Sequence, residues 1–141
     1  MDEGLAALIA GVASLIGGLA GARMGSKATI ASARYKGRQE AYHALTTALN
    51  QFRHSLEAND FTQASFEAAD RRVHDVVNDV SREGPPKVAK IAKDIRLRCL
   101  EIRQEVEGGN LGSLDQRVAA WRARILPLRD DLDEAIFKHG I

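Results

Sequence analysis

The sequence is poor in the residues on which disulfide-linked domains, thiolate metal clusters and aromatic-rich β-sheets depend. Its 141 residues include one cysteine, three prolines, four Phe, two Tyr and one Trp. A single cysteine excludes an internal disulfide and a thiolate metal cluster. Because the other apolar residues are mainly Leu, Ile, Val and Ala, the composition favours an all-α protein. Cys99 falls on a helical apolar stripe, so we interpret it as a small core residue.

The chain also lacks an excess of either charge. Its formal net charge is +1 at pH 7, whereas a general nucleic-acid binder usually carries a clear basic excess. This balance argues against a nucleic-acid partner. The charges are unevenly distributed, however. The 18 residues from Leu5 to Ala22 contain none, and the chain is densely charged from Arg23 onward.

The uncharged run is long enough to cross a membrane as a helix. Eighteen helical residues rise about 27 Å, close to the roughly 30 Å thickness of the hydrocarbon core. We therefore predict a transmembrane helix over residues 5–24, after a short extracytoplasmic terminus over residues 1–4. The alternatives are a cleaved signal peptide and a helix buried in an oligomer. The acidic start, Asp2-Glu3, argues against a signal peptide, which begins with basic residues.

Positive charge gathers directly after this run. Five basic residues precede the next acidic residue, and they are Arg23, Lys27, Arg34, Lys36 and Arg38. By the positive-inside rule, the N-terminus lies outside and the C-terminal part lies in the cytoplasm. The Ala- and Arg-rich usage and the single span favour the cytoplasmic membrane of a bacterium. Within this basic juxtamembrane region (residues 25–40 and the end of the span), we predict that Arg23, Lys27, Arg34 and Arg38 contact anionic lipid. Alternatively, they only set the topology.

The apolar run separates large from small residues around a helix. At about 100° per residue, its large side chains fall within an arc of roughly 120°. The opposite side contains a doubled GxxxG pattern at Gly17, Gly21 and Gly25. Because small residues let membrane helices approach closely, we predict that this face drives self-association. The residues assigned to helix–helix assembly are Ala10, Ser14, Gly17, Gly18, Gly21 and Gly25.

Helical periodicity continues through the rest of the chain and predicts a cytoplasmic bundle over residues 41–140. The expected helices cover residues 28–58, 61–83, 86–107 and 113–138. Asp60 is the expected N-cap of the second helix, and Gly84-Pro85-Pro86 separates the second from the third. Ser113 and Gln116 have the spacing of a capping box, and Pro127 should kink or split the last helix.

Four amphipathic helices with short connections favour an antiparallel bundle, because this arrangement buries every apolar stripe. The alternative is a coiled-coil hairpin that completes its core by oligomerising. The first bundle helix can be continuous with the span. In that case Gly25 and Gly37 are its weakest points.

The sequence offers few candidates for chemistry. Glu40 and His43 have one half of a di-iron motif, but no second copy exists. Asp70 and His74, four residues apart, are expected to form a surface hydrogen bond. The mixed-charge arginine series at residues 117–129 is expected to be a solvated face, and Trp121 a core anchor. We therefore predict no catalytic residues, no metal, no cofactor, no small-molecule substrate and no enzymatic activity.

These observations favour a membrane-anchored, non-enzymatic helical protein. Its partners would be the lipid bilayer, further copies of itself and a cytoplasmic protein that its bundle docks or scaffolds. One alternative is a small pore-former of the holin, toxin or defence-effector type. Another is a soluble helical oligomer whose N-terminal helix is buried.

Overall fold

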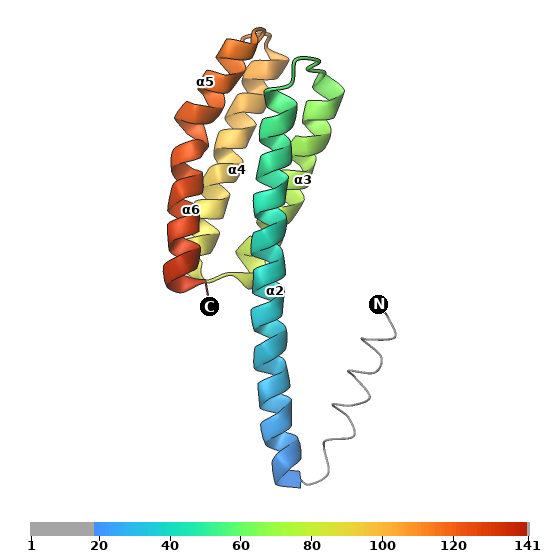
Figure 1. Ribbon diagram of the computed structural model, residues 1–141, viewed down its shortest axis with the longest axis vertical. Helices are drawn as coiled ribbons and strands as arrows, with labels where there is room; N and C mark the ends of the chain where they lie inside the picture. The colour runs from blue at the N-terminus through green and yellow to red at the C-terminus, as the bar shows by residue number, and fades with distance from the viewer. Residues whose placement is uncertain (1–18, 141) are drawn as a thin grey trace. The chain divides into compact units, whose positions relative to one another are not determined.

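The computed structural model describes residues 19–140, with side chains from residue 33 onward (Figure 1). The described residues form helices joined by short loops and contain no strand, which confirms the all-α prediction for this part of the chain. The helices are α2 (Leu19–Leu56), α3 (Gln63–Glu83), α4 (Pro86–Glu107), α5 (Leu114–Arg124) and α6 (Leu126–His139).

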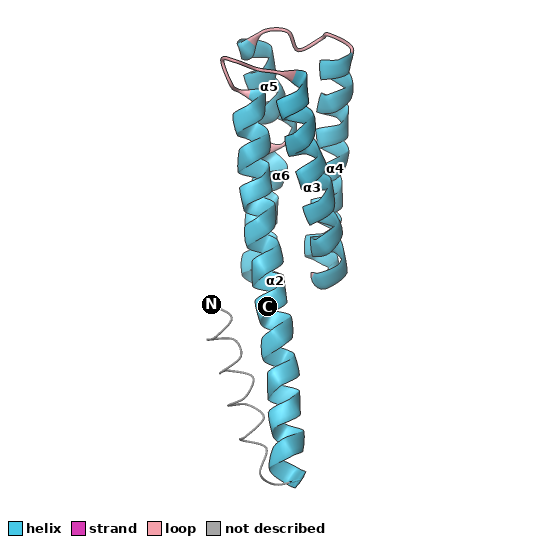
Figure 2. Ribbon diagram, turned by 90° about the vertical axis from the view of Figure 1, so that its right-hand side faces the viewer, coloured by secondary structure: helices cyan, strands magenta, loops and turns pink. Residues whose placement is uncertain are grey.

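The chain divides into two compact units, residues 1–36 and 37–141. The second unit is a helical bundle in which the C-terminal part of α2, α3, α4 and the α5–α6 pair lie side by side (Figures 1 and 2). Successive helices run in opposite directions, with α5 and α6 following one another along the same side. Short connections force this antiparallel order, because a two- to six-residue loop can only return the chain beside the helix it left.

Local sequence signals explain where the helices of the bundle begin and end. Thr62 caps α3, since its hydroxyl accepts a hydrogen bond from the Ser65 amide at 3.2 Å. The prediction of Asp60 as this cap was wrong, because the chain makes a further turn before the helix starts. Pro86 lies in the first turn of α4, where a missing amide proton costs nothing. After α4, Gly109 adopts a φ of 77°, a left-handed conformation that glycine tolerates best.

The last helical segment is split, as Pro127 implies. Ser113 and Gln116 form a complete capping box at the start of α5. α5 and α6 meet at Ile125, whose amide donates to Trp121 O and whose carbonyl accepts from Arg129 N, and Pro127, which has no amide proton to donate, lies in the first turn of α6. Ile125 itself is fully buried, so the break does not expose the core.

The core runs the length of the bundle and is built mainly from aliphatic side chains. Its largest fully buried members are Trp121, Phe52, Phe66, Leu45, Leu49, Leu56, Ile95, Ile102, Ile125 and Leu132. Phe52 packs against both Phe66 and Trp121, with ring centroids 5.1 and 6.2 Å apart. Every helix of the bundle contributes, so removing any one of them would expose apolar surface.

α2 begins earlier than residue 28, the start expected from the sequence. It includes Gly25 and Gly37, and the helix is unbroken at both. The cost of a glycine within a helix is about 1 kcal/mol, which the neighbouring alanines and long polar residues offset.

The predicted span falls largely outside the described residues. Of the assembly residues, Ala10, Ser14, Gly17 and Gly18 lie there, whereas Gly21 and Gly25 are part of α2. Within the described residues, no helix is both long and apolar enough to cross a membrane.

Candidate functional site

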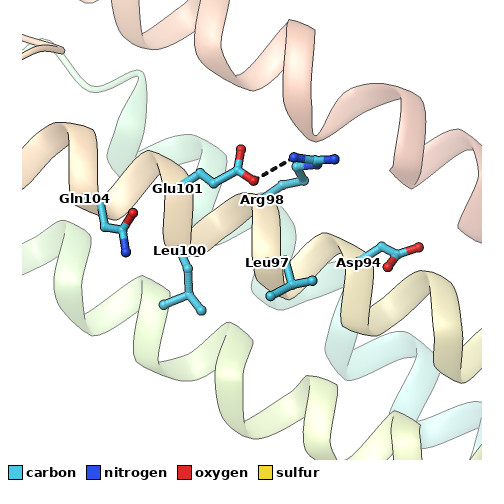
Figure 3. A pocket seen from close by; sticks show the side chains of 6 residues that line it. All are labelled: Asp94, Leu97, Arg98, Leu100, Glu101 and Gln104. Atoms are coloured by element: carbon cyan, nitrogen blue, oxygen red, sulfur yellow. Dashed lines mark hydrogen bonds and ion pairs between the residues drawn. The ribbon is translucent and has the colours of Figure 1, made fainter.

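A shallow groove on the outer face of α4 is one candidate site (Figure 3). Leu97 and Leu100 supply its apolar surface, and Leu97 is 58% exposed. Asp94, Arg98, Glu101 and Gln104 complete the lining. Arg98 donates to Glu101 at 2.6 Å, so these two charges neutralise each other. The groove therefore suits a weak apolar contact better than a charged small molecule.

The most strongly buried charge of the described bundle is Asp70, on α3. Arg96 donates to its Oδ1 at 2.6 Å and Arg103 donates to its Oδ2 at 3.1 Å, both from α4. Asp70 is fully buried. The expected surface hydrogen bond between Asp70 and His74 was therefore wrong, and His74 instead contacts Asn78. Asp70 faces the core because it lies in register with Phe66.

This cluster, which we call the Asp70 cluster (Asp70, Arg96 and Arg103), is a structural link between α3 and α4. A buried carboxylate is tolerated only when it is paired and hydrogen-bonded, and two guanidinium groups satisfy both conditions. Arg103 also donates from its Nε to Glu107 at 2.8 Å, and this hydrogen bond to the carboxylate raises the pKa of Arg103. Both oxygens of Asp70 accept from these guanidinium groups and the residue is fully buried, so neither oxygen is presented to a substrate.

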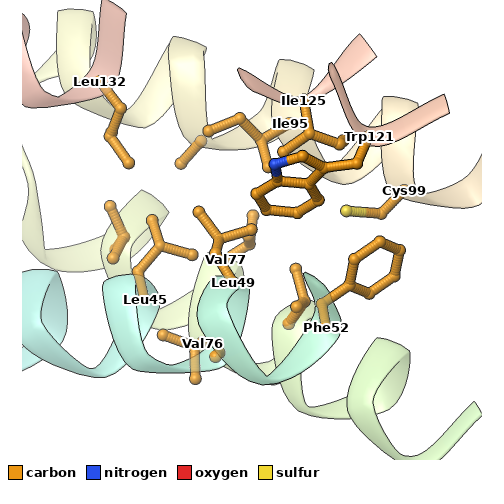
Figure 4. Packing of buried hydrophobic residues seen from close by; sticks show 14 of the residues in the cluster. Leu45, Leu49, Phe52, Val76, Val77, Ile95, Cys99, Trp121, Ile125 and Leu132 are labelled. Atoms are coloured by element: carbon orange, nitrogen blue, oxygen red, sulfur yellow. The ribbon is translucent and has the colours of Figure 1, made fainter. Parts of the chain in front are cut away.

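Cys99 belongs to the apolar core and lies beside Trp121 and Phe52 (Figure 4). It is fully buried, as predicted. Burial, together with the nearby negative charge of Asp70, raises the pKa of the Cys99 thiol to about 12, and Arg96 opposes this only in part. A thiol with this pKa is neutral at physiological pH and is a poor nucleophile.

Arg117 is the second buried charge, and its partners are backbone carbonyls rather than acids. Its Nε donates to Leu56 O at 2.7 Å, at the end of α2. Its Nη1 donates to Leu111 O and Gly112 O at 3.2 and 3.1 Å. The guanidinium also stacks on Phe61, 4.4 Å from the ring centroid. The expectation of a solvated arginine face was wrong at this position, because Arg117 closes the end of the bundle.

The opposite end, where the chain enters the bundle, is fastened by two long-range hydrogen bonds. Arg38 Nε donates to Glu83 O at 2.8 Å, and Tyr42 Oη donates to Gly140 O at 3.0 Å. Burial raises the pKa of Tyr42, which keeps its hydroxyl protonated and able to donate. These contacts join α2 to the ends of α3 and α6.

The predicted lipid-contacting residues are not equivalent in the structure. The side chains of Arg23 and Lys27 lie outside the described set. Arg34 is exposed. Arg38 donates from its Nε to Glu83 O at the end of α3, a contact within the bundle that the sequence did not predict.

No group of metal-ligating side chains is found among the described residues, which include Glu40 and His43. No family model matches the chain, and no curated protein or solved structure is significantly similar to it. The function must therefore be inferred from the residues and their geometry.

The sequence interpretation missed the Asp70 cluster and the role of Arg117. A signal for both exists. Asp70 stands between Phe66 and Val73, and Arg117 stands four residues before Trp121, so each occupies a position of the apolar stripe. A charged residue in such a position must find partners or expose the core.

Proposed function

We propose that the protein is a membrane-anchored, non-enzymatic helical protein whose bundle is an interaction module on the cytoplasmic side. The observation that carries the proposal is the continuity of α2. This helix starts at Leu19, inside the uncharged run, and extends to Leu56 in the bundle core. The end of the uncharged run and part of the bundle core therefore belong to one described helix, with the basic segment between them.

The chemistry of the described bundle supports a non-enzymatic role. Its buried ionisable groups, which are Asp70, Arg117, Cys99 and Tyr42, are committed to packing and to contacts within the fold. A catalytic acid, base or nucleophile needs a free atom facing a substrate cavity, with a pKa near the working pH. The thiol of Cys99, with a pKa of about 12, is far from that condition.

Self-association through the small-residue face remains part of this proposal. The face is defined by sequence at Gly17, Gly21 and Gly25, and association in lipid depends on such close packing. The bundle itself supplies the outer groove of α4, with exposed Leu97, as a contact surface for a cytoplasmic protein.

The experiment that tests the anchor combines membrane fractionation with cysteine labelling from outside. Cys99 is unsuitable as a label site, because it is buried and its thiol is neutral. We would compare Asp2→Cys with Asn110→Cys, which is exposed in the loop after α4. Asp2→Cys should react with a membrane-impermeant maleimide in intact cells, and Asn110→Cys only after lysis.

Each result has a clear meaning. Carbonate-resistant membrane association with this labelling pattern supports the anchor and its orientation. Labelling of Asn110→Cys in intact cells would reverse the orientation. Recovery of the protein in the carbonate-soluble fraction would overturn the anchor, and the small-residue face would then be a seam inside a water-soluble oligomer.

A further inference from the structure

Helices α4 and α6 lie side by side in the bundle and carry opposite charges on their outward sides (Figure 1). On α6, Asp130, Asp131 and Asp133 are exposed and form no ion pair within the described residues. On the first half of α4, Lys87 and Lys93 are likewise exposed, and neither has a partner in that part of the chain. The two outward sides therefore present complementary charges that the fold itself does not use.

The remaining charges of this region are already neutralised or withdrawn from the surface. The pairs are Glu134 with Lys138, Lys90 with Asp94, Arg98 with Glu101, and Arg96 with Asp70. Arg129, the other basic residue of α6, is partly buried. The charge imbalance between the two sides thus comes from the three aspartates of α6 and the two lysines of α4.

The fold places these opposite charges at the same level along the bundle. Tyr42 marks the level, because its hydroxyl donates to Gly140 O at 3.0 Å and its ring lies 3.7 Å from the Cβ position of Gly84. From this end α4 runs away, and α6 runs toward it (Figure 1). Lys93 is seven residues beyond the start of α4 and Asp133 is seven before Gly140. At 1.5 Å per residue, both lie about 10 Å from the end.

We propose that the outward side of α6 binds the outward side of α4 in a second copy of the chain, with the two bundles side by side in the same orientation. Because α4 and α6 run in opposite directions, they are antiparallel across this contact. Lys93 of one copy then faces Asp133 of the other. Phe137, which is 88% exposed, lies at the level of Lys90, where a cation can approach its ring.

A second copy is the occupant that the charges favour, because each copy supplies both complementary sides. Pairing α4 with α4 in the same orientation would set Lys93 against Lys93. Pairing α6 with α6 would set Asp133 against Asp133, and both arrangements are repulsive. The mixed contact leaves one α4 side and one α6 side free at the edges of a pair. Further copies can therefore add, until a ring closes or an open row continues.

This inference rests on the proposed function. A single helix-to-helix contact is smaller than the roughly 800 Å² per partner that is typical of stable complexes, so it is weak between free molecules. An anchor in one bilayer gives all copies the same orientation and raises their effective concentration. The small-residue face and the contact between α4 and α6 would then act together on neighbouring copies.

The first test uses the native sequence of the full chain, reconstituted into phosphatidylcholine vesicles from equal amounts of isotopically light and heavy protein. A zero-length carbodiimide joins an amine to a carboxylate that touches it. Lys93 should form cross-links of mixed isotope to the segment 130–134. The cross-link between Lys138 and Glu134, which are hydrogen-bonded within one chain, should contain a single isotope and is the internal control.

Charge reversal provides a second readout, which is the energy transfer between copies labelled at Asn110→Cys. These variants are made in the Gly21→Leu background, in which a large side chain obstructs the small-residue face. Lys93→Glu alone and Asp133→Lys alone should each lower the energy transfer severalfold. The double variant restores opposite charges on the two sides and should recover the transfer.

The matched controls reverse the same charges at exposed positions on α3. Arg72→Glu and Asp75→Lys should leave the energy transfer unchanged. An equal loss in these variants, or no recovery in the double variant, would overturn the contact between α4 and α6.

The cross-links distinguish this inference from the anchor. If the cross-links of Lys93 contain a single isotope in vesicle-bound protein, the contact is overturned and the anchor stands. If mixed cross-links join Lys93 to acids outside α6, the copies meet through another surface and this inference is also overturned. Failure of the wild-type chain to float with vesicles overturns the proposed function, and the inference falls with it.

Discussion

Asp70 is the residue at which the largest single-site effect on stability is expected. Asp70→Asn keeps the shape of the side chain but leaves Arg96 without its negative partner and Arg103 with Glu107 alone. Breaking a buried ion pair costs about 3–5 kcal/mol. The measurement is urea unfolding of the full chain in mild detergent, followed by the fluorescence of Trp121, the only tryptophan.

Glu101→Gln is the control for this prediction. Glu101 pairs with Arg98 at 2.6 Å, but both side chains are about half exposed, so its loss should cost under about 1 kcal/mol. Equal destabilisation by the two variants would show that the Asp70 cluster has no special role.

Cys99 gives a prediction about pH. Its thiol has a pKa of about 12 in the fold, against 9.0 for the unperturbed group, so folding favours the neutral form. The stabilisation that depends on this thiol is complete below about pH 9 and is lost as the pH rises toward 12, because the unfolded chain ionises first. The stability advantage of wild type over Cys99→Ala should therefore be constant from pH 6 to about 8 and shrink above about pH 9.

Urea unfolding of both proteins at successive pH values checks this prediction. The other titrating groups, Tyr42 included, are present in both chains and largely cancel in the difference. A gap that stays constant to pH 11, or that widens, would contradict the raised pKa of Cys99.

The sequence predicts the burial of a single residue correctly when its polarity agrees with its position on the apolar stripe. Cys99 and Trp121 are apolar residues on apolar stripes, and both are buried as expected. Asp70 and Arg117 are charged residues on such stripes, where the two signals conflict. Asp70 and Arg117 are buried because other segments of the chain supply partners for their charges. The long side chain of Arg96, for example, reaches Asp70 from a position that periodicity assigns to the surface.

Arg117 connects the end of α2 with the loop before α5, so its substitution tests how the helices are held together. Arg117→Ala removes the donors to Leu56 O, Leu111 O and Gly112 O, and the stacking on Phe61. Hydrogen bonds from a charged group contribute about 1.5–3 kcal/mol, so we expect a loss of about 2–4 kcal/mol. Arg117→Lys should recover only part, because an ammonium lacks the planar fork that reaches several carbonyls.

Hydrogen exchange locates this effect. Amide protection should fall most at the end of α2 and at the start of α5 in Arg117→Ala. Arg122→Ala, an exposed arginine on the same helix, should change neither stability nor protection measurably. Uniform loss of protection across the bundle would contradict a local closing role.

Most helix boundaries within the bundle could be predicted from local sequence signals, whereas the start of the long helix α2 could not. Pro86, the Ser113 capping box and Pro127 act through backbone atoms within one turn, so the sequence predicts their effects directly. The start of α2 was harder to predict, because Gly25 and the polar residues around it give no apolar stripe to follow. The cap at Thr62 was missed because Asp60 offers an equivalent oxygen two residues earlier.

For the part of the molecule that the structure describes, composition and periodicity were sufficient to predict helices without strands and a helical bundle. They do not predict contacts between residues far apart in sequence, such as the hydrogen bond from Tyr42 to Gly140 O, because these partners meet only through the antiparallel order of the helices.

The final prediction concerns assembly of the full chain in a bilayer. Gly21→Leu places a large side chain in the middle of the small-residue face and prevents close approach of two helices. We expect association to weaken at least about tenfold, which corresponds to roughly 1.4 kcal/mol. Energy transfer between donor- and acceptor-labelled copies at Asn110→Cys, titrated against lipid, measures the change.

Ala20→Leu is the matched control. Ala20 is four residues after Ile16 and projects beside the large residues of the same helical run, so an added leucine there should face lipid and leave energy transfer unchanged. Equal loss in both variants would point to general disturbance of the span. An unchanged signal in both, with wild-type copies still associated, would place the assembly surface in the bundle, where Leu97→Ser then becomes the variant expected to dissociate the copies.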